Sequence, residues 1–157
     1  MSADRPPCGR IVAGVHRLPI RVYYEDTDAG GVVYYANYLK FAERARTEML
    51  RCCCVDQERL RREAGIGLVV RRAAVDFLAP ARLDDELTVA TRLLDHAGAT
   101  LELAQEIARG DTALVRLEIR AACVRADGRP TRLPPALVAA IVHLSPQDST
   151  MVDAHAR

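Results

Sequence analysis

The hydrophobic residues of the chain follow two different periods, one in its first half and another in its second. Between residues 34 and 53, apolar side chains recur three or four positions apart, which is the period of one helix face. Charged residues such as Lys40, Glu43 and Arg44 lie between them. The apolar members of the set are Tyr34, Tyr38, Phe41, Ala42, Ala45 and Met49. This spacing predicts a long amphipathic helix from about Tyr34 to about Cys53.

After residue 65 the period changes to two, which is typical of strands with one buried and one solvated face. The alternation is clearest between Leu101 and Ile107. Turn-forming residues such as Pro80, Gly98 and Gly110 divide this region into four predicted strands. These strands are expected to run from Ile66 to Leu78, Glu86 to Asp95, Ala99 to Arg109 and Thr112 to Arg125.

Three shorter elements complete the prediction. Leu18 to Glu25 has the Ile, Val and Tyr composition of a strand and runs into a cluster of turn-forming residues. Gln57 to Ala64 is predicted as a charged helix, and Ala136 to Leu144 as a short terminal helix after two prolines. We assign residues 1–17 to a loose N-terminal extension, 18–145 to one domain and 146–157 to a C-terminal tail.

The order of one strand, one long helix and four long strands predicts an α+β fold. In such a fold the helix covers one face of an antiparallel sheet. A length of 157 residues suits a single domain. One helix cannot hide both faces of so long a sheet, so we expect the chain to pair with a second copy, as a homodimer or a homotetramer.

The overall composition limits the partners of the chain. Its 22 basic and 21 acidic residues leave a net charge of +1, which argues against nucleic acid as a ligand. No apolar run approaches the roughly 20 residues of a membrane-spanning helix, so we expect no membrane span and a cytoplasmic protein. The five cysteines are an odd number without regular spacing, which favours reduced thiols, and we interpret the run from Cys52 to Cys54 as helix-end packing.

The scarcity of some side chains excludes several kinds of chemistry. Serine occurs only at Ser2, Ser145 and Ser149, without a nucleophile-elbow motif, which argues against a serine hydrolase. Lys40 is the only lysine and no phosphate-binding glycine loop precedes it, which argues against phosphoryl transfer. The four histidines are widely scattered in the sequence, so we predict no metal site.

All five tyrosines lie between residues 23 and 38, and Asp26 and Asp28 lie among them. Such an aromatic cluster marks either the centre of the core or the wall of a ligand site. The carboxylates also have two interpretations. In one, an aspartate caps a turn or the helix start. In the other, it acts as nucleophile or general base while N–H groups at the helix start stabilise an oxyanion, and Gly30 and Gly31 let a substrate approach the backbone.

The segment from Tyr23 to Phe41, YYEDTDAGGVVYYANYLKF, is followed from Glu43 by ERARTEMLR. Together they resemble the signature of the 4-hydroxybenzoyl-CoA thioesterase family, and most resemble its bacterial branch of acyl-CoA thioesterases associated with the Tol-Pal system. A second match, from Ala79 to Asp85, has the spacing of that branch. The resemblance covers roughly Leu18 to Val142 and implies a hotdog fold, in which a curved antiparallel sheet wraps around one long central helix.

The resemblance also implies the site residues. Asp28 corresponds to the catalytic carboxylate that attacks the thioester or activates water, and the backbone N–H of Tyr35 corresponds to the oxyanion donor. Many members of the branch have histidine at this second position, whereas 4-hydroxybenzoyl-CoA enzymes have tyrosine. We expect substrate contacts from Gly30, Gly31, Val33, Tyr38, Arg71 and Arg72, the two arginines against CoA phosphates. The family's sites lie at a dimer interface, and CoA belongs to the substrate, so no cofactor is expected.

Three functions remain open from the sequence. The leading hypothesis is hydrolysis of an acyl-CoA thioester to a free acid and CoA. A second is a non-catalytic module that binds acyl-CoA or an acyl carrier protein with the same pocket. A third is a hotdog dehydratase, which uses a histidine with a carboxylate. It ranks last because no histidine lies between His16 and His96.

Overall fold

The computed structural model describes residues 7–145, so the predicted C-terminal tail and the first six residues of the predicted extension lie outside the described residues. Within them, six antiparallel strands form one sheet in the order β1-β2-β4-β5-β6-β3. The strands are β1 (Arg10–Val12), β2 (Val15–Arg21), β3 (Ile66–Phe77), β4 (Glu86–Ala97), β5 (Thr100–Arg109) and β6 (Thr112–Arg125).

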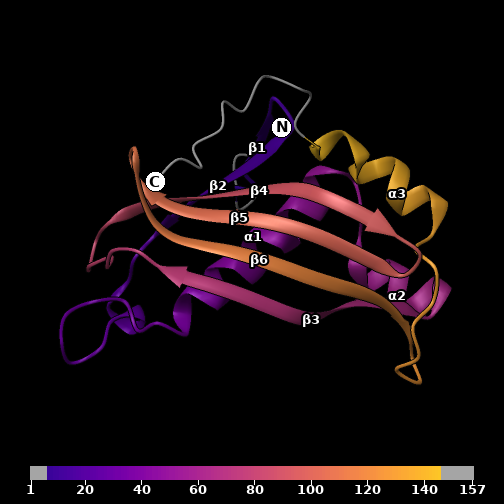
Figure 1. The fold of residues 1–157 in the computed structure, drawn as a ribbon, viewed down its shortest axis with the longest axis horizontal. Coiled ribbons are helices and arrows are strands. Elements are labelled where there is room, and N and C mark those ends of the chain that lie inside the picture. The colour runs from indigo at the N-terminus through magenta and orange to yellow at the C-terminus, as the bar shows by residue number, and fades with distance from the viewer. Residues whose placement is uncertain (1–6, 146–157) are drawn as a thin grey trace, which may run out of the picture.

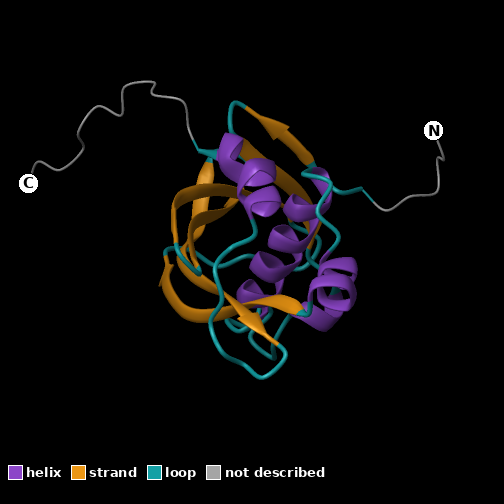
Figure 2. Cartoon of the chain, turned by 90° about the vertical axis from the view of Figure 1, so that its right-hand side faces the viewer, coloured by secondary structure: helices purple, strands orange, loops and turns teal. Residues whose placement is uncertain are grey.

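The sheet curves around one long helix, α1 (Asn37–Cys52), as Figure 1 and the end view in Figure 2 show. Phe41, Ala45 and Met49 on the inner face of α1 are buried in the same core as Val89 and Ile107 of the sheet. Burial of these side chains accounts for the position of the helix, because it removes the apolar stripe from water. The predicted α+β architecture is confirmed.

The four long strands lie within a few residues of their predicted bounds. In β5, Leu101, Leu103 and Ile107 point into the core while the residues between them are partly exposed, as the alternation predicts. The remaining inward position is Gln105, whose side-chain amide donates to the Ala42 carbonyl at 3.0 Å and to the Thr91 hydroxyl at 2.9 Å. A buried polar group is tolerated here because it is hydrogen-bonded.

The sheet begins earlier in the chain than the sequence predicts. Strands β1 and β2 both start inside the range 1–17 that we assigned to an extension. Ala13 and Gly14 join them in a two-residue turn in which both residues have positive φ, at 50° and 75°. Turns of this kind suit the twist of a hairpin, but alanine is an unusual residue for one, so the sequence carries little signal for it.

The predicted first strand also ends earlier than expected, at Arg21. Residues Tyr24–Asp26 form a short 3₁₀ turn, η1. The Asp26 carboxylate accepts the Tyr23 backbone N–H at 2.8 Å, which closes this turn and takes Tyr23 out of the strand. The hydrogen bond to Asp26 therefore determines the local backbone, despite the strand propensity of Tyr23 and Tyr24.

Three short helical elements lie toward one end of the sheet (Figure 1). Helix α2 (Gln57–Ala64) has its predicted bounds, an Asp56 cap on the Arg59 N–H and a left-handed Gly65 at its end. The predicted terminal helix divides into α3 (Pro135–Ile141) and the 3₁₀ turn η2 (Val142–Leu144). Among residues 7–145, no helix has the length and apolarity required to cross a membrane.

Candidate active site

The loop before α1 folds back on itself as a narrow hairpin. The Asp28 N–H donates to the Val32 carbonyl at 2.9 Å, and the Tyr34 N–H donates to the Asp26 carbonyl at 2.9 Å. The Asn37 side-chain amide reaches the same Asp26 carbonyl at 2.8 Å, and Asn37 is only 8% exposed. The first residue of the helix therefore holds the carboxylate-bearing loop in place.

Asp28 lies exposed at the tip of this hairpin, and its two carboxylate oxygens differ. Oδ1 accepts the Gly30 N–H at 2.8 Å and the Val32 N–H at 3.4 Å. Oδ2 has no hydrogen-bond partner among residues 7–145. The capping interpretation thus accounts for one oxygen, while the other faces outward and is available to a ligand.

The glycines after Asp28 let the loop turn tightly. A Cβ at Gly30 would lie 3.1 Å from Asp28 Oδ1, so a side chain there would press on the carboxylate. Gly31 has φ of +77°, a conformation that disfavours other residues. Both predicted substrate-binding glycines are exposed close to Asp28 in the sequence, and the local geometry favours glycine at each of them.

Helix α1 starts with backbone donors left over. The N–H groups of Tyr35 and Ala36 have no acceptor among the hydrogen bonds of the described residues, and no side chain caps the helix at Ala36. Unpaired N–H groups at a helix start attract negative charge, because the peptide dipoles add along the axis. The Tyr35 N–H is thus available to donate a hydrogen bond to an oxyanion.

A second loop, residues 79–85, locks the first one to the sheet. The Val33 N–H donates to the Ala81 carbonyl at 2.8 Å, and the Ala81 N–H donates to the Tyr38 hydroxyl at 3.0 Å. Asp85 closes this loop by accepting the Arg82 N–H at 2.8 Å and pairing with Arg109 at 2.7 Å. Partial burial opposes ionisation of Asp85, but these two partners outweigh it and lower its pKa.

The tyrosines divide into one core residue and four surface residues. Tyr38 is 3% exposed, and burial raises the pKa of its hydroxyl. The other four, Tyr23, Tyr24, Tyr34 and Tyr35, are between 46% and 83% exposed. Tyr35 also meets the exposed ring of Phe77 edge-on, with centroids 6.1 Å apart. The core interpretation therefore holds for Tyr38 alone, while Tyr34, Tyr35 and Phe77 form an exposed aromatic surface.

The remaining predicted substrate contacts lie in different surroundings. Val33 and Tyr38 are buried within the single chain, and the Tyr38 hydroxyl is already bonded to Ala81. Arg71 and Arg72 are exposed on β3, which is an edge strand, and Arg71 falls at a break in register between Val70 and Arg72. No side-chain hydrogen bond joins either arginine to another described residue, so both are free to contact an anion.

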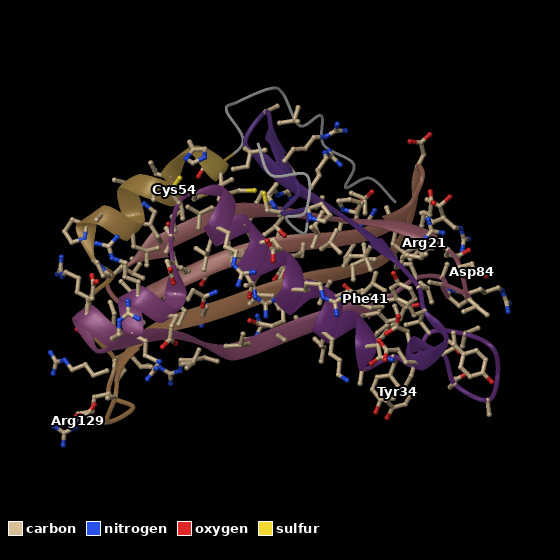
Figure 3. The ribbon with its side chains drawn as sticks, turned by 180° about the vertical axis from the view of Figure 1, so that it is seen from behind. Arg21, Tyr34, Phe41, Cys54, Asp84 and Arg129 are labelled. Atoms are coloured by element: carbon tan, nitrogen blue, oxygen red, sulfur yellow. The ribbon has the colours of Figure 1, made fainter. Side chains whose placement is uncertain are left out.

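A large hollow lies away from this site. It has a volume of about 1580 Å³ and is lined by Cys8, Glu48 and Cys54, near the C-terminal end of α1. A second hollow of about 470 Å³ lies over the sheet strands. Neither of these two hollows is lined by Asp28 or Tyr35. Figure 3 shows Tyr34 and Cys54 at opposite ends of the helix, with Phe41 between them.

Comparison with known proteins assigns the family. The model of the Thioesterase-like superfamily matches residues 22–141. The chain belongs to this superfamily. It is 44% identical over 128 residues to the acyl-CoA thioesterase YbgC of Haemophilus influenzae, an alignment covering 81% of this chain and 94% of the relative.

Solved structures agree with this thioesterase-like assignment. A probable thioesterase from Bartonella henselae has a TM-score of 0.73 at 38% identity, covering 76% of this chain and 99% of the other. A 4-hydroxybenzoyl CoA thioesterase variant, solved with 4-hydroxybenzoyl CoA, has a TM-score of 0.78 at 21% identity, covering 82% and 99%. The second likeness concerns the fold alone, and it confirms the predicted hotdog architecture.

Two residues that hold this thioesterase-like loop were missed by sequence reasoning. Asn37 comes two residues after the Tyr34–Tyr35 pair, and an asparagine near a predicted helix start was a usable signal for a side-chain bond to the backbone. Ala81 offers no such signal, because it acts through its backbone alone. The segment from Ala79 to Asp85 was recognised as a motif, but only the structure shows that it contacts the Asp28 loop.

Proposed function

We propose that this chain hydrolyses an acyl-CoA thioester to a free acid and CoA. The observation that carries the proposal is the pairing, on one short loop, of an uncommitted Asp28 Oδ2 with an unpaired Tyr35 N–H. Membership of the Thioesterase-like superfamily and the acyl-CoA thioesterase relatives support the same reaction. No cofactor enters the proposed reaction, because CoA is part of the substrate.

In this proposal Asp28 attacks the thioester carbonyl or takes a proton from a water that does so. The Tyr35 N–H donates to the carbonyl oxygen as negative charge develops on it. The carbon–sulfur bond then breaks, and the CoA sulfur leaves and gains a proton. In the nucleophilic route an acyl-aspartate anhydride forms first, and water then hydrolyses it and restores the carboxylate.

A second copy of the chain completes the site in our proposal. The aromatic surface of Tyr34, Tyr35 and Phe77 and the edge strand β3 are exposed in the single chain. An unpaired strand edge beside exposed aromatic rings favours association with another copy. We therefore expect a homodimer or homotetramer, with Arg71 and Arg72 near the CoA phosphates. An acyl carrier protein is an alternative carrier of the same thioester.

The test is turnover of short, long and aromatic acyl-CoAs by the wild type and by Asp28→Asn, with products separated by chromatography. Loss of the carboxylate is expected to lower kcat by about 100- to 10,000-fold. Asp84→Asn is the matched control. Asp84 is an exposed loop aspartate with a left-handed backbone conformation, which asparagine also adopts readily. Full activity in Asp28→Asn would exclude the proposed mechanism.

Labelled water separates the two chemical routes. The experiment is a single turnover in heavy-oxygen water. In the nucleophilic route, water that attacks the Asp28 carbonyl of the anhydride leaves its labelled oxygen on Asp28, and the acid departs with an unlabelled aspartate oxygen. The general-base route places the label directly in the acid. Label on the peptide that contains Asp28, detected by mass spectrometry, therefore demonstrates the nucleophilic route.

The alternative is a non-catalytic acyl-CoA or acyl-carrier-protein binding module. Its support is that Asp28 Oδ1 already caps the Gly30 N–H, a role that needs no chemistry. Stoichiometric binding of acyl-CoA by the wild type, with no product formed, favours this function. The dehydratase hypothesis gains nothing, because His16 is fully buried on β2 rather than beside Asp28.

A further inference from the structure

Two thiols meet at the C-terminal end of α1, far from the proposed active site. Cys52 lies in the last turn of the helix, and Cys8 lies just before β1. Their Sγ atoms are 3.2 Å apart, although 43 residues separate them in sequence. The Cys52 thiol also donates to the Cys8 carbonyl at 3.2 Å. A disulfide bond is about 2.05 Å long, so a movement of roughly 1 Å would bring the sulfurs to bonding distance.

The segment that carries Cys8 is held in place by the sheet. The ring of His16, which is fully buried, contacts the Cys8 carbonyl through Nε2 at 2.8 Å. Gly9 packs so closely that an added Cβ would lie 2.4 Å from the Arg17 carbonyl oxygen and 2.9 Å from His16 Nε2. Gly9 also has φ of +79°, which favours glycine. The approach of Cys8 to Cys52 is therefore fixed by several neighbouring contacts.

The other three cysteines are placed differently. Cys123 is buried on β6, Cys53 is partly buried at the helix end, and Cys54 is exposed with φ of 59°. Among residues 7–145, the thiol–thiol contact of Cys52 with Cys8 is the only one between cysteine side chains. The same residues contain no group of three or more side chains arranged for a metal ion. The contact thus favours covalent sulfur chemistry over metal binding.

We propose that Cys8 and Cys52 are a redox modification site that closes into an intrachain disulfide. The oxidant is a small-molecule disulfide such as oxidised glutathione. One protein thiolate attacks it, forms a mixed disulfide and releases one small thiol. The second protein sulfur then attacks the first, forms the Cys8–Cys52 bond and releases the other small thiol. Two protein thiol hydrogens are thereby transferred, and two small thiols are produced.

The surroundings of Cys8 and Cys52 indicate which of the two thiols reacts first with the oxidant. Cys8 lines the hollow of about 1580 Å³, so a small disulfide can reach it from solvent. Burial, then the neighbouring Cys8 thiol, raise the pKa of Cys52 to about 12. Cys8, which the small disulfide can reach from the hollow, therefore reacts first with the oxidant, and Cys52, whose Sγ lies 3.2 Å away, resolves the mixed disulfide as its thiolate.

The first experiment is peptide mapping of the full-length wild type after equilibration in glutathione buffers from reducing to oxidising. We expect loss of two hydrogens per chain and a cross-linked peptide pair joining Cys8 to Cys52, reversed by dithiothreitol. Fragmentation must place the bond on Cys52, because Cys53 and Cys54 share its tryptic peptide. A bond from Cys8 to either neighbour, a Cys52–Cys53 bond, a link between two chains or no bond at all would each overturn the proposal.

The second experiment measures thermal unfolding of the oxidised and reduced forms. A disulfide that closes a loop of this length is expected to raise Tm by roughly 10 °C. Cys8→Ser and Cys52→Ser should lose this shift, whereas the matched controls Cys53→Ser and Cys54→Ser should keep it. Retention of the shift in Cys52→Ser would contradict the assignment. Peptide mapping of the wild type decides the matter even where a variant folds poorly.

Discussion

The two ends of helix α1 are built in opposite ways. At the N-terminal end the Tyr35 and Ala36 N–H groups are unpaired, Asp28 is exposed, and aromatic rings face solvent. At the C-terminal end the Cys53 N–H bonds within the helix, and the Cys8 carbonyl accepts from both Cys52 and His16. The N-terminal end leaves exposed backbone donors without partners, whereas the helix N–H and the Cys8 carbonyl at the C-terminal end are bonded within the chain, although the buried His16 Nδ1 there has no partner.

This difference in hydrogen bonding between the two helix ends indicates which end is more suitable for binding a ligand. Polar groups that the protein has not satisfied are available to a substrate, whereas satisfied groups stabilise the chain. The larger hollow lies at the C-terminal end, yet it lacks the pairing of a carboxylate with free backbone donors. Hollow volume alone would therefore select the opposite end of α1 from the one that we propose for thioester chemistry.

The largest expected effect on stability comes from a cavity in the core between the two ends of α1. Phe41 is 1% exposed in the middle of the core. Phe41→Ala is expected to lower the free energy of unfolding by about 3–5 kcal/mol, because it removes buried area and leaves a cavity. Urea unfolding measures the loss. Leu39→Ala is the control, since Leu39 is 42% exposed on the same helix and should cost far less.

A smaller effect is expected from loosening the N-terminal end alone. Asn37→Ala removes the amide that donates to the Asp26 carbonyl and should lower the free energy of unfolding by about 1–3 kcal/mol. It should also lower kcat, because the Asp28 loop loses its tether to the helix. Unfolding and turnover are measured together. A loss of stability with unchanged kcat would show that the tether does not position Asp28.

At the C-terminal end, the stability of the chain should depend on pH through His16. Burial lowers the pKa of His16 below its usual 6.5, against the opposing Cys8 carbonyl and Glu48. The unfolded chain therefore binds the proton more tightly, and stability is lost as pH falls below about 6.5 toward the folded pKa. Urea unfolding above and below this pH checks the prediction. In His16→Gln this part of the pH dependence should disappear.

The smallest effect is expected at an exposed ion pair beside the site end. Arg21 and Glu86 are 2.6 Å apart, with side chains 49% and 77% exposed. Glu86→Gln should change the free energy of unfolding by at most about 0.2–1 kcal/mol, because water and salt screen the pair. Unfolding at low and high salt measures it. A loss as large as that of Asn37→Ala would mean that the pair does more than neutralise charge.

Periodicity predicted the regular elements well, because the apolar stripe of α1 and the alternation of β5 follow directly from burial on one face. It failed at Tyr23 and Ala13, where a side-chain cap and a positive-φ turn decide the backbone. The resemblance supplied Asp28 and Tyr35 as candidates, but Asn37 and Ala81 came only from the structure. The contact between Cys8 and Cys52 spans most of the first third of the chain, and no local pattern encodes it.

The bond from the Ala81 N–H to the Tyr38 hydroxyl also has a consequence for synthesis of the chain. It joins residues 43 positions apart, and the neighbouring bond from Val33 reaches the same residue. Contacts of such sequence separation form late, since the intervening chain must first close. On the ribosome, the Asp28 loop therefore has no docking partner until the chain beyond residue 81 has emerged. The proposed thioesterase site therefore cannot reach its final arrangement until more than half of the chain has been synthesised.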